Sequence, residues 1–92
     1  MRYAVETTPR FNRMARRFFR RHPDLRDRFI RLVTELEADP FQPHLRLHPL
    51  TGEYAGQHAV SLTYEYRVVL ILRVTERHII LTAIGDHDEV YR

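Results

Sequence analysis

The sequence predicts an α+β domain in which an antiparallel helical hairpin covers one face of a mostly antiparallel sheet. Three observations predict it: a short alternating segment near the N-terminus, two segments with apolar side chains at helical spacing, and three later segments of strand character. The expected order is strand, helix, helix and a three-stranded meander with a short C-terminal tail. The 92 residues suit a single domain, residues 1–92.

The first strand is expected at residues 2–6, where apolar and polar side chains alternate weakly. A helix should follow, with Thr8 as its N-cap and Pro9 at its first helical position. It should end at His22, because the residue before a proline is pushed out of the helical region. Its apolar stripe consists of Phe11, Met14, Ala15, Phe18 and Phe19.

A second helix is expected to begin at Asp24 as its N-cap and to stop at Asp39-Pro40. Its apolar stripe consists of Leu25, Phe29, Leu32, Val33 and Leu36. The connection to the first helix is so short that the two must form an antiparallel hairpin. Residues 40–49, with three prolines, are expected to form a loop.

The meander is expected at residues 57–64, 66–74 and 78–85, after a turn-rich segment. The first of these strands alternates, which places Val60, Leu62 and Tyr64 on one face. The second is almost continuously apolar, as expected of a central strand that is covered on both faces.

Composition excludes several classes of protein. The sequence has no cysteine, so disulfides, thiolate nucleophiles and cysteine-ligated metal sites are excluded. The longest apolar run, residues 68–72, is too short to cross a bilayer, and no long apolar segment opens the chain. We therefore expect a cytoplasmic protein without a membrane partner.

Charge is distributed unevenly along the chain. Residues 1–46 contain 11 arginines and 6 acids, a net charge of +5, whereas residues 47–92 contain 4 arginines and 6 acids, a net charge of −2. All 15 basic residues are arginines. A bias toward GC-rich codons explains the absence of lysine, but it does not explain why the arginines cluster. The first helix carries six arginines and no acid, and these are candidates to bind an RNA backbone: Arg10, Arg13, Arg16, Arg17, Arg20 and Arg21. The alternative is a solvated helix face.

Arg67 and His87 are the strongest candidates for chemistry. Arg67 begins the apolar central strand, and its parity places it on one face with Val69 and Ile71. A fixed cation there is suited to neutralising the charge that develops on a phosphorane. His87 follows the last strand and can transfer a proton at neutral pH. A solvated arginine and a surface histidine bonded to its acidic neighbours are the alternatives.

Other candidates lie near the same strand ends. His48 precedes the meander and is a candidate base for a 2′-hydroxyl, and His58 is a candidate phosphate contact, although ordinary loop polarity explains His58 better. Glu65 lies in the turn beside Arg67 and either orients a partner or is simply a turn acid. Tyr91 either stacks on a base, donates a proton or packs on the sheet.

Asp86-His87-Asp88-Glu89 raises the question of a metal site, because hard cations bind clustered carboxylates. Four successive residues cannot all face one ion, and no second ligand cluster follows at a recognised spacing. We therefore expect no metal and no cofactor.

Three short motifs resemble the RelE/ParE superfamily of bacterial toxins, and most closely its YafQ- and YoeB-like mRNA interferases. They are His48-Pro49-Leu50-Thr51-Gly52-x-x-x-Gly56, Tyr66-Arg67-Val68-Val69 and Ile84-Gly85-Asp86-His87-Asp88-Glu89-Val90-Tyr91. The resemblance covers the whole chain and implies a RelE-like fold. It also implies a toxin of a type II toxin–antitoxin system that enters the ribosomal A site and cuts mRNA. Cleavage would be metal-independent and would use the 2′-hydroxyl of the RNA.

The resemblance also implies roles for matched positions. Arg67 matches the catalytic arginine, His87 the C-terminal catalytic histidine and Tyr91 an aromatic residue of the tail. His48 matches a histidine of YafQ-like toxins, which is a glutamate base in YoeB-like ones, and Glu65 matches an acid. The implied partners are a cognate antitoxin, the ribosome and mRNA, with operator DNA contacted only through the antitoxin.

One position departs from the pattern. Ser61 stands where YafQ-like toxins have a second active-site histidine. Two other functions therefore stay open. One is a ParE-like toxin that binds DNA gyrase without nuclease chemistry, and the other is a catalytically decayed relative that only binds RNA or a partner.

Overall fold

A computed structural model describes residues 2–91, and the side chain of Tyr91 lies outside what it describes. The strands are β1 (Ala4–Thr7), β2 (His48–Pro49), β3 (His58–Ser61), β4 (Tyr66–Arg73) and β5 (His78–Asp86). The helices are α1 (Pro9–Arg21), α2 (Arg26–Ala38) and α3 (His87–Tyr91), with single 3₁₀ turns η1 (Pro23–Leu25), η2 (Pro43–Leu45) and η3 (Gly52–Tyr54). None of the helices in the described part is long and apolar enough to span a membrane.

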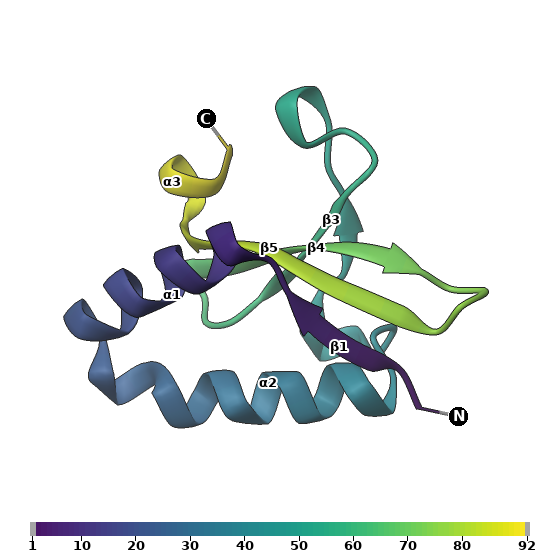
Figure 1. The fold of residues 1–92 in the computed structure, drawn as a ribbon, viewed down its shortest axis with the longest axis horizontal. Coiled ribbons are helices and arrows are strands. Elements are labelled where there is room, and N and C mark those ends of the chain that lie inside the picture. The colour runs from purple at the N-terminus through teal and green to yellow at the C-terminus, as the bar shows by residue number, and fades with distance from the viewer. Residues whose placement is uncertain (1, 92) are drawn as a thin grey trace.

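The strands form one sheet in the order β1-β5-β4-β3-β2, so β4 is central, as its apolar sequence predicts. β1 pairs with β5 in parallel, whereas β2, β3, β4 and β5 pair with one another antiparallel. Figure 1 shows α2 below the sheet and α3 above it. The sheet is therefore a layer between two unequal sets of covering elements.

Strand β5 contains a β-bulge, which shifts the alternation of its side chains between the two faces of the sheet. Val69 is opposite Ala83 and Leu70 is opposite Leu81, so Thr82 is the extra residue. Because of this insertion, Leu81 and Ile84 both face the helices although they are three residues apart. The Thr82 hydroxyl lies 2.6 Å from the side-chain oxygen of Gln57 and ties the bulge to the start of β3.

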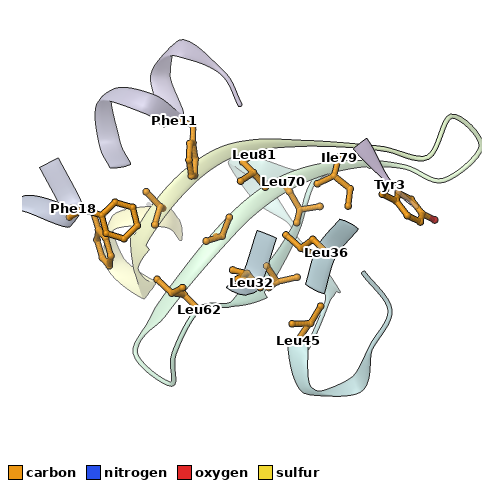
Figure 2. Packing of buried hydrophobic residues seen from close by; sticks show 14 residues of the cluster. Tyr3, Phe11, Phe18, Leu32, Leu36, Leu45, Leu62, Leu70, Ile79 and Leu81 are labelled. Atoms are coloured by element: carbon orange, nitrogen blue, oxygen red, sulfur yellow. The ribbon is translucent and has the colours of Figure 1, made fainter. Parts of the chain in front are cut away.

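The larger core lies between the helical hairpin and the sheet (Figure 2). α1 begins where the sequence predicts, since the Thr8 hydroxyl accepts a hydrogen bond from the Phe11 amide at 3.0 Å and Pro9 occupies the first turn. The ring of Phe29 on α2 is stacked on that of Phe11, with centroids 5.9 Å apart, and is tilted against that of Phe19, with centroids 5.4 Å apart. These contacts join the two helices. The two apolar stripes therefore pack on each other and on the sheet.

A smaller core covers the opposite face of the sheet. Val90 of α3 and Tyr54 of η3 pack there against Val69 and Ala83 of the sheet. Val90 is completely buried. Burying one valine stabilises α3 by about 1.5–3 kcal/mol, so Val90 anchors the described part of this short helix to the sheet.

Several sequence expectations were wrong in detail. Asp24 does not cap α2, because the chain after Pro23 forms η1 and α2 begins two residues later, with Leu25 at the cap position and no side-chain cap. The loop at residues 40–49 contains η2 and the short strand β2, so the sheet has one strand more than expected. Tyr64 does not lie on one strand face with Val60 as expected, because β3 ends at Ser61 and the Tyr64 side chain is exposed.

Candidate active site

The face of the sheet opposite the helical hairpin carries two cross-strand rows of side chains. Directly paired residues present their side chains on the same face, so the pairing register defines each row. The first row consists of His48, Ala59, Val69 and Ala83, and the second row of Ser61, Arg67 and Gly85.

These rows bring His48 and Arg67 into one cleft with His87. The cleft has a volume of about 870 Å³, and its walls include His48 from β2, Ser61 from β3, Arg67 from β4 and His87 from α3. His48 and Arg67 are two strands and one row apart, which corresponds to roughly 12 Å between Cα atoms. Two histidines and an arginine, distant in sequence, therefore surround a space large enough for a bound group.

The guanidinium group of Arg67 is held by the turn between β3 and β4. Its Nη1 atom donates to the carbonyl oxygens of Thr63 at 3.0 Å, Tyr64 at 2.8 Å and Tyr66 at 3.3 Å. The side chain is half-buried, and Arg67 pairs directly with Ser61 across the strands. These bonds fix the position of the cation, so it can stabilise negative charge without reorganising.

The ring of His48 is oriented by the backbone of Arg46. His48 Nδ1 lies 2.9 Å from the carbonyl oxygen of Arg46. A carbonyl only accepts hydrogen bonds, so Nδ1 carries the proton, and the lone pair of a neutral ring is then on Nε2. Arg46 adopts the left-handed region at φ 58°, which is unusual for a residue other than glycine and turns its carbonyl toward the ring.

His87 begins α3, and the acids around it form a capping box. The Glu89 amide donates to Asp86 Oδ1 at 2.8 Å, while the Asp86 amide donates to Glu89 Oε1 at 3.0 Å. Glu89 also forms an ion pair with Arg21 at 3.2 Å, which ties α3 to the end of α1. The acids flanking His87 therefore fix the helix that carries it, and no cluster suited to a metal ion lies among the described residues.

Gly85 is required for the close approach of α3 to the sheet. A Cβ atom at this position would lie 2.9 Å from Glu89 Cβ and 3.1 Å from Glu89 Oε1. Real Cβ atoms essentially never show the first of these distances, and the second is tighter than most real Cβ contacts. The absence of a side chain at Gly85 therefore places His87 at the edge of the cleft.

A second, smaller cleft of about 510 Å³ adjoins the first. Both clefts are lined by Arg46, Arg67 and His87, and the smaller one is also lined by Tyr64, Glu65, Asp86 and Asp88. Glu65 therefore lies beside Arg67 as expected, but in this neighbouring cleft. Tyr91 is the last residue of α3, and its side chain is outside the described part of the structure.

His58 is not brought into either cleft. It shares the parity of Val60 on β3, and it is paired with Leu70, so it faces the helical side of the sheet. Its Nδ1 atom is buried without a hydrogen-bond partner among the described residues. Its position gives no support to a contact with phosphate at the cleft.

The six arginines of α1 are all exposed: Arg10, Arg13, Arg16, Arg17, Arg20 and Arg21. Arg10 donates to the carbonyl of the bulge residue Thr82 at 3.5 Å, and Arg21 pairs with Glu89. These two lie toward the sheet and α3. Arg13, Arg16 and Arg20 lie on one outer stripe, because they are spaced by three and four residues.

Sequence reasoning missed Arg46 and Tyr64. Arg46 follows the η2 turn, and nothing in its neighbourhood signals that a left-handed residue would line both clefts. Tyr64 was expected on one strand face with Val60 and Leu62, whereas it lies in the β3–β4 turn and its side chain is 87% exposed.

No protein-family model matches the sequence, and no curated protein matches it. Solved structures do match. YafQ from E. coli has a TM-score of 0.81 at 16% identity, covering 98% of this chain and 99% of YafQ. A chain of the E. coli DinJ–YafQ toxin–antitoxin complex has a TM-score of 0.80 at 17% identity, with both chains fully covered. A YoeB/ParE toxin from Agrobacterium tumefaciens has a TM-score of 0.71 at 19% identity, covering 90% of this chain and 96% of that one. The fold implied by the sequence resemblance, that of the RelE/ParE superfamily, is thereby confirmed.

Proposed function

We propose that this chain is the toxin of a type II toxin–antitoxin system and a metal-independent endoribonuclease that cleaves mRNA in the ribosomal A site. One observation carries the proposal: the shared cleft of His48, Arg67 and His87, which come from three separate elements. A base, a cation and an acid around one space are the groups that cleavage by a 2′-hydroxyl needs.

The first step is proton removal from the 2′-hydroxyl of the RNA. His48 is the base, and its Nε2 atom takes the proton because Nδ1 is bonded to the Arg46 carbonyl. The 2′-oxygen then attacks the adjacent phosphorus. The bond from phosphorus to the 5′-oxygen of the next nucleotide breaks, which leaves a 2′,3′-cyclic phosphate.

The second requirement is a proton for the departing 5′-oxygen. Protonated His87 supplies this proton, so one histidine gains a proton and the other loses one in each cleavage. Arg67 stabilises the negative charge on the phosphorane oxygens between them. Glu65 lies beside Arg67 in the smaller cleft and helps to orient substrate there. Tyr91, the last residue of α3, is the proposed stacking partner of an RNA base.

The surface of α1 supplies affinity for the ribosome. Six exposed arginines on one helix repel one another, and the phosphates of an RNA backbone relieve that repulsion. The counterions released from the RNA further favour binding. The substrate is thus mRNA held on the ribosome in the cytoplasm.

An antitoxin is the proposed protein partner. The DinJ–YafQ structure is a toxin–antitoxin complex, and one of its chains matches this chain over its full length. Operator DNA would be contacted only through the antitoxin. The acidic or amphipathic segment expected of such a partner would complement the arginines of α1.

Ser61 supports a second candidate function, a relative that binds RNA or a partner without cutting. Ser61 lies directly opposite Arg67 in the cleft, at the position where YafQ-like toxins have a histidine. A hydroxyl is a poor proton carrier at neutral pH. A gyrase-binding toxin is the third candidate, but it has no need for a base and an acid in one cleft.

The decisive experiment maps RNA 5′ ends after the purified chain is added to ribosomes translating a defined mRNA. Arg67→Ala and His87→Ala should each reduce cleavage by about 100-fold or more. His78→Gln is the matched control, because it changes a histidine at the other end of β5. Circular dichroism must show that each variant is folded, since Arg67 also bonds the turn carbonyls.

In-frame cuts within A-site codons by wild type and His78→Gln, but by neither of the other variants, would support the proposal. Intact mRNA with growth arrest in cells would favour gyrase or another binding target. Equal cleavage by all four proteins would show that Arg67 and His87 are not part of the chemistry.

A further inference from the structure

The smaller cleft lies on the His87 side of Arg67. This position indicates which side of the scissile phosphate the cleft would hold. His48 lines the larger cleft but not the smaller one, whereas Arg67 and His87 line both. If His48 takes the 2′-hydroxyl proton, the nucleoside on the 5′ side lies in the larger cleft. His87 protonates the departing 5′-oxygen, so the nucleoside on the 3′ side lies beyond it.

We propose that the smaller cleft binds the nucleoside on the 3′ side of the scissile phosphate, with Tyr64 as the stacking platform for its base. The proposal rests on the proposed function, because the direction of the RNA follows from the roles of His48 and His87. It adds a binding site that Arg67 and His87 border and that Tyr64 and Glu65 of the β3–β4 turn extend away from His48.

Tyr64 is suited to this role because its ring is open and its backbone is fixed. The side chain is 87% exposed, and no ring or cation among the described residues is stacked on it. Its carbonyl accepts the 2.8 Å hydrogen bond from Arg67 Nη1. The platform and the arginine that stabilises the phosphorane are therefore held at a fixed separation by one turn.

The charges of the cleft indicate that it takes a base and a ribose and not a phosphate. Glu65, Asp86 and Asp88 line it together with Arg46, Arg67 and His87, and the carboxylates repel any phosphate that these three basic groups do not already hold. Asp86 is committed to the cap of α3, while the Glu65 and Asp88 side chains are exposed. Carboxylates accept hydrogen bonds from amino groups on bases. Arg46, at the border of the two clefts, offsets part of this negative charge next to the scissile phosphate.

The direct test is an NMR titration of the whole chain with a short oligoribonucleotide whose riboses carry 2′-O-methyl groups, which removes the attacking hydroxyl. Base stacking on Tyr64 should move its ring proton signals upfield as Arg67 and His87 signals shift. A matched oligonucleotide that ends at the 3′-phosphate, and so lacks the 3′ nucleoside, should shift Arg67 and leave Tyr64 unmoved.

Variants then measure the contribution of the ring. Tyr64→Ala should raise the dissociation constant for the oligonucleotide by about tenfold or more. Tyr64→Phe, which keeps the ring, should change it less than about twofold. Val74→Ala is the control, since Val74 is an exposed apolar residue in the turn at the opposite end of β4. It should have no effect.

The subsite is overturned if Tyr64 signals stay unmoved while Arg67 and His87 respond, or if the truncated oligonucleotide moves Tyr64 equally. It is also overturned if no cleft residue responds at millimolar oligonucleotide. Cleavage on ribosomes is measured separately and decides the proposed function. Wild-type cleavage with an unchanged Tyr64→Ala rate would remove the subsite and leave the nuclease in place.

Discussion

Replacing Gly85 by alanine tests how tightly α3 is held against the sheet. The new Cβ would lie 2.9 Å from Glu89 Cβ, which belongs to the first turn of α3 and cannot swing away like the end of a side chain. Ordinary contact begins at 3.4 Å, so the helix must move by about half an ångström. The buried side chain of Val90 resists that movement.

The expected loss of stability is about 2 kcal/mol. Overpacking of this kind costs about 1–3 kcal/mol, and distortion of the two capping hydrogen bonds adds up to about 1 kcal/mol. Alanine also restricts the unfolded chain, which offsets about 0.5–1 kcal/mol. For a domain of this size the melting temperature should fall by roughly 8–16 °C.

A double-mutant cycle with Glu89 shows whether the loss has this cause. All three atoms nearest to the added Cβ belong to Glu89. In a Glu89→Gly background, where the clash partner is absent, Gly85→Ala should therefore cost almost nothing. Calorimetry of the four proteins gives the coupling free energy. An equal fall in melting temperature in both backgrounds would refute the assigned contact.

Three further changes test the helix start, the arginine stripe and the cleft. Thr8→Ala should destabilise the fold by about 1 kcal/mol by removing the α1 cap, and Thr8→Ser should retain most of that stability; an equal loss in both would exclude the capping bond. Replacing the outer arginines of α1, which are Arg13, Arg16 and Arg20, by glutamine should weaken ribosome binding and make the slope of log affinity against log salt less steep by about 2–3. Unchanged affinity at every salt concentration would exclude this stripe from the RNA interface. Ser61→His should raise the single-turnover cleavage rate at least about tenfold by adding a proton carrier opposite Arg67, and an unchanged rate would contradict that role.

The first helix was predictable because its signals are local, whereas α2 begins later than expected and α3 lies where a tail was expected. Thr8, Pro9 and the His22-Pro23 pair define α1 within a few residues, and the observed bounds agree with them. The central position of β4 also followed from its own composition. Strand β2 was not predictable, since two residues joined to β3 only by pairing carry no periodicity. The bulge at Thr82 likewise depends on the partner strand.

The candidate site was predictable as far as motifs mark it. His48, Arg67 and His87 were chosen from the sequence, and the structure places them around one cleft. Their chemical roles stay predictions. Arg46 was missed because a left-handed backbone at an arginine follows from tertiary packing and not from local residue preference. Tyr64 was misplaced because the end of β3 could not be read from alternation alone.

The two outer strands of the sheet have a consequence for aggregation and for partner binding. β2 is two residues long, and one of them is Pro49, which has no amide hydrogen to offer. β1 has four residues at the other border. Short strands and proline are devices by which sheets avoid recruiting further strands. A partner that pairs along the whole length of β3 by strand addition would therefore have to displace β2 from His58 and Ala59.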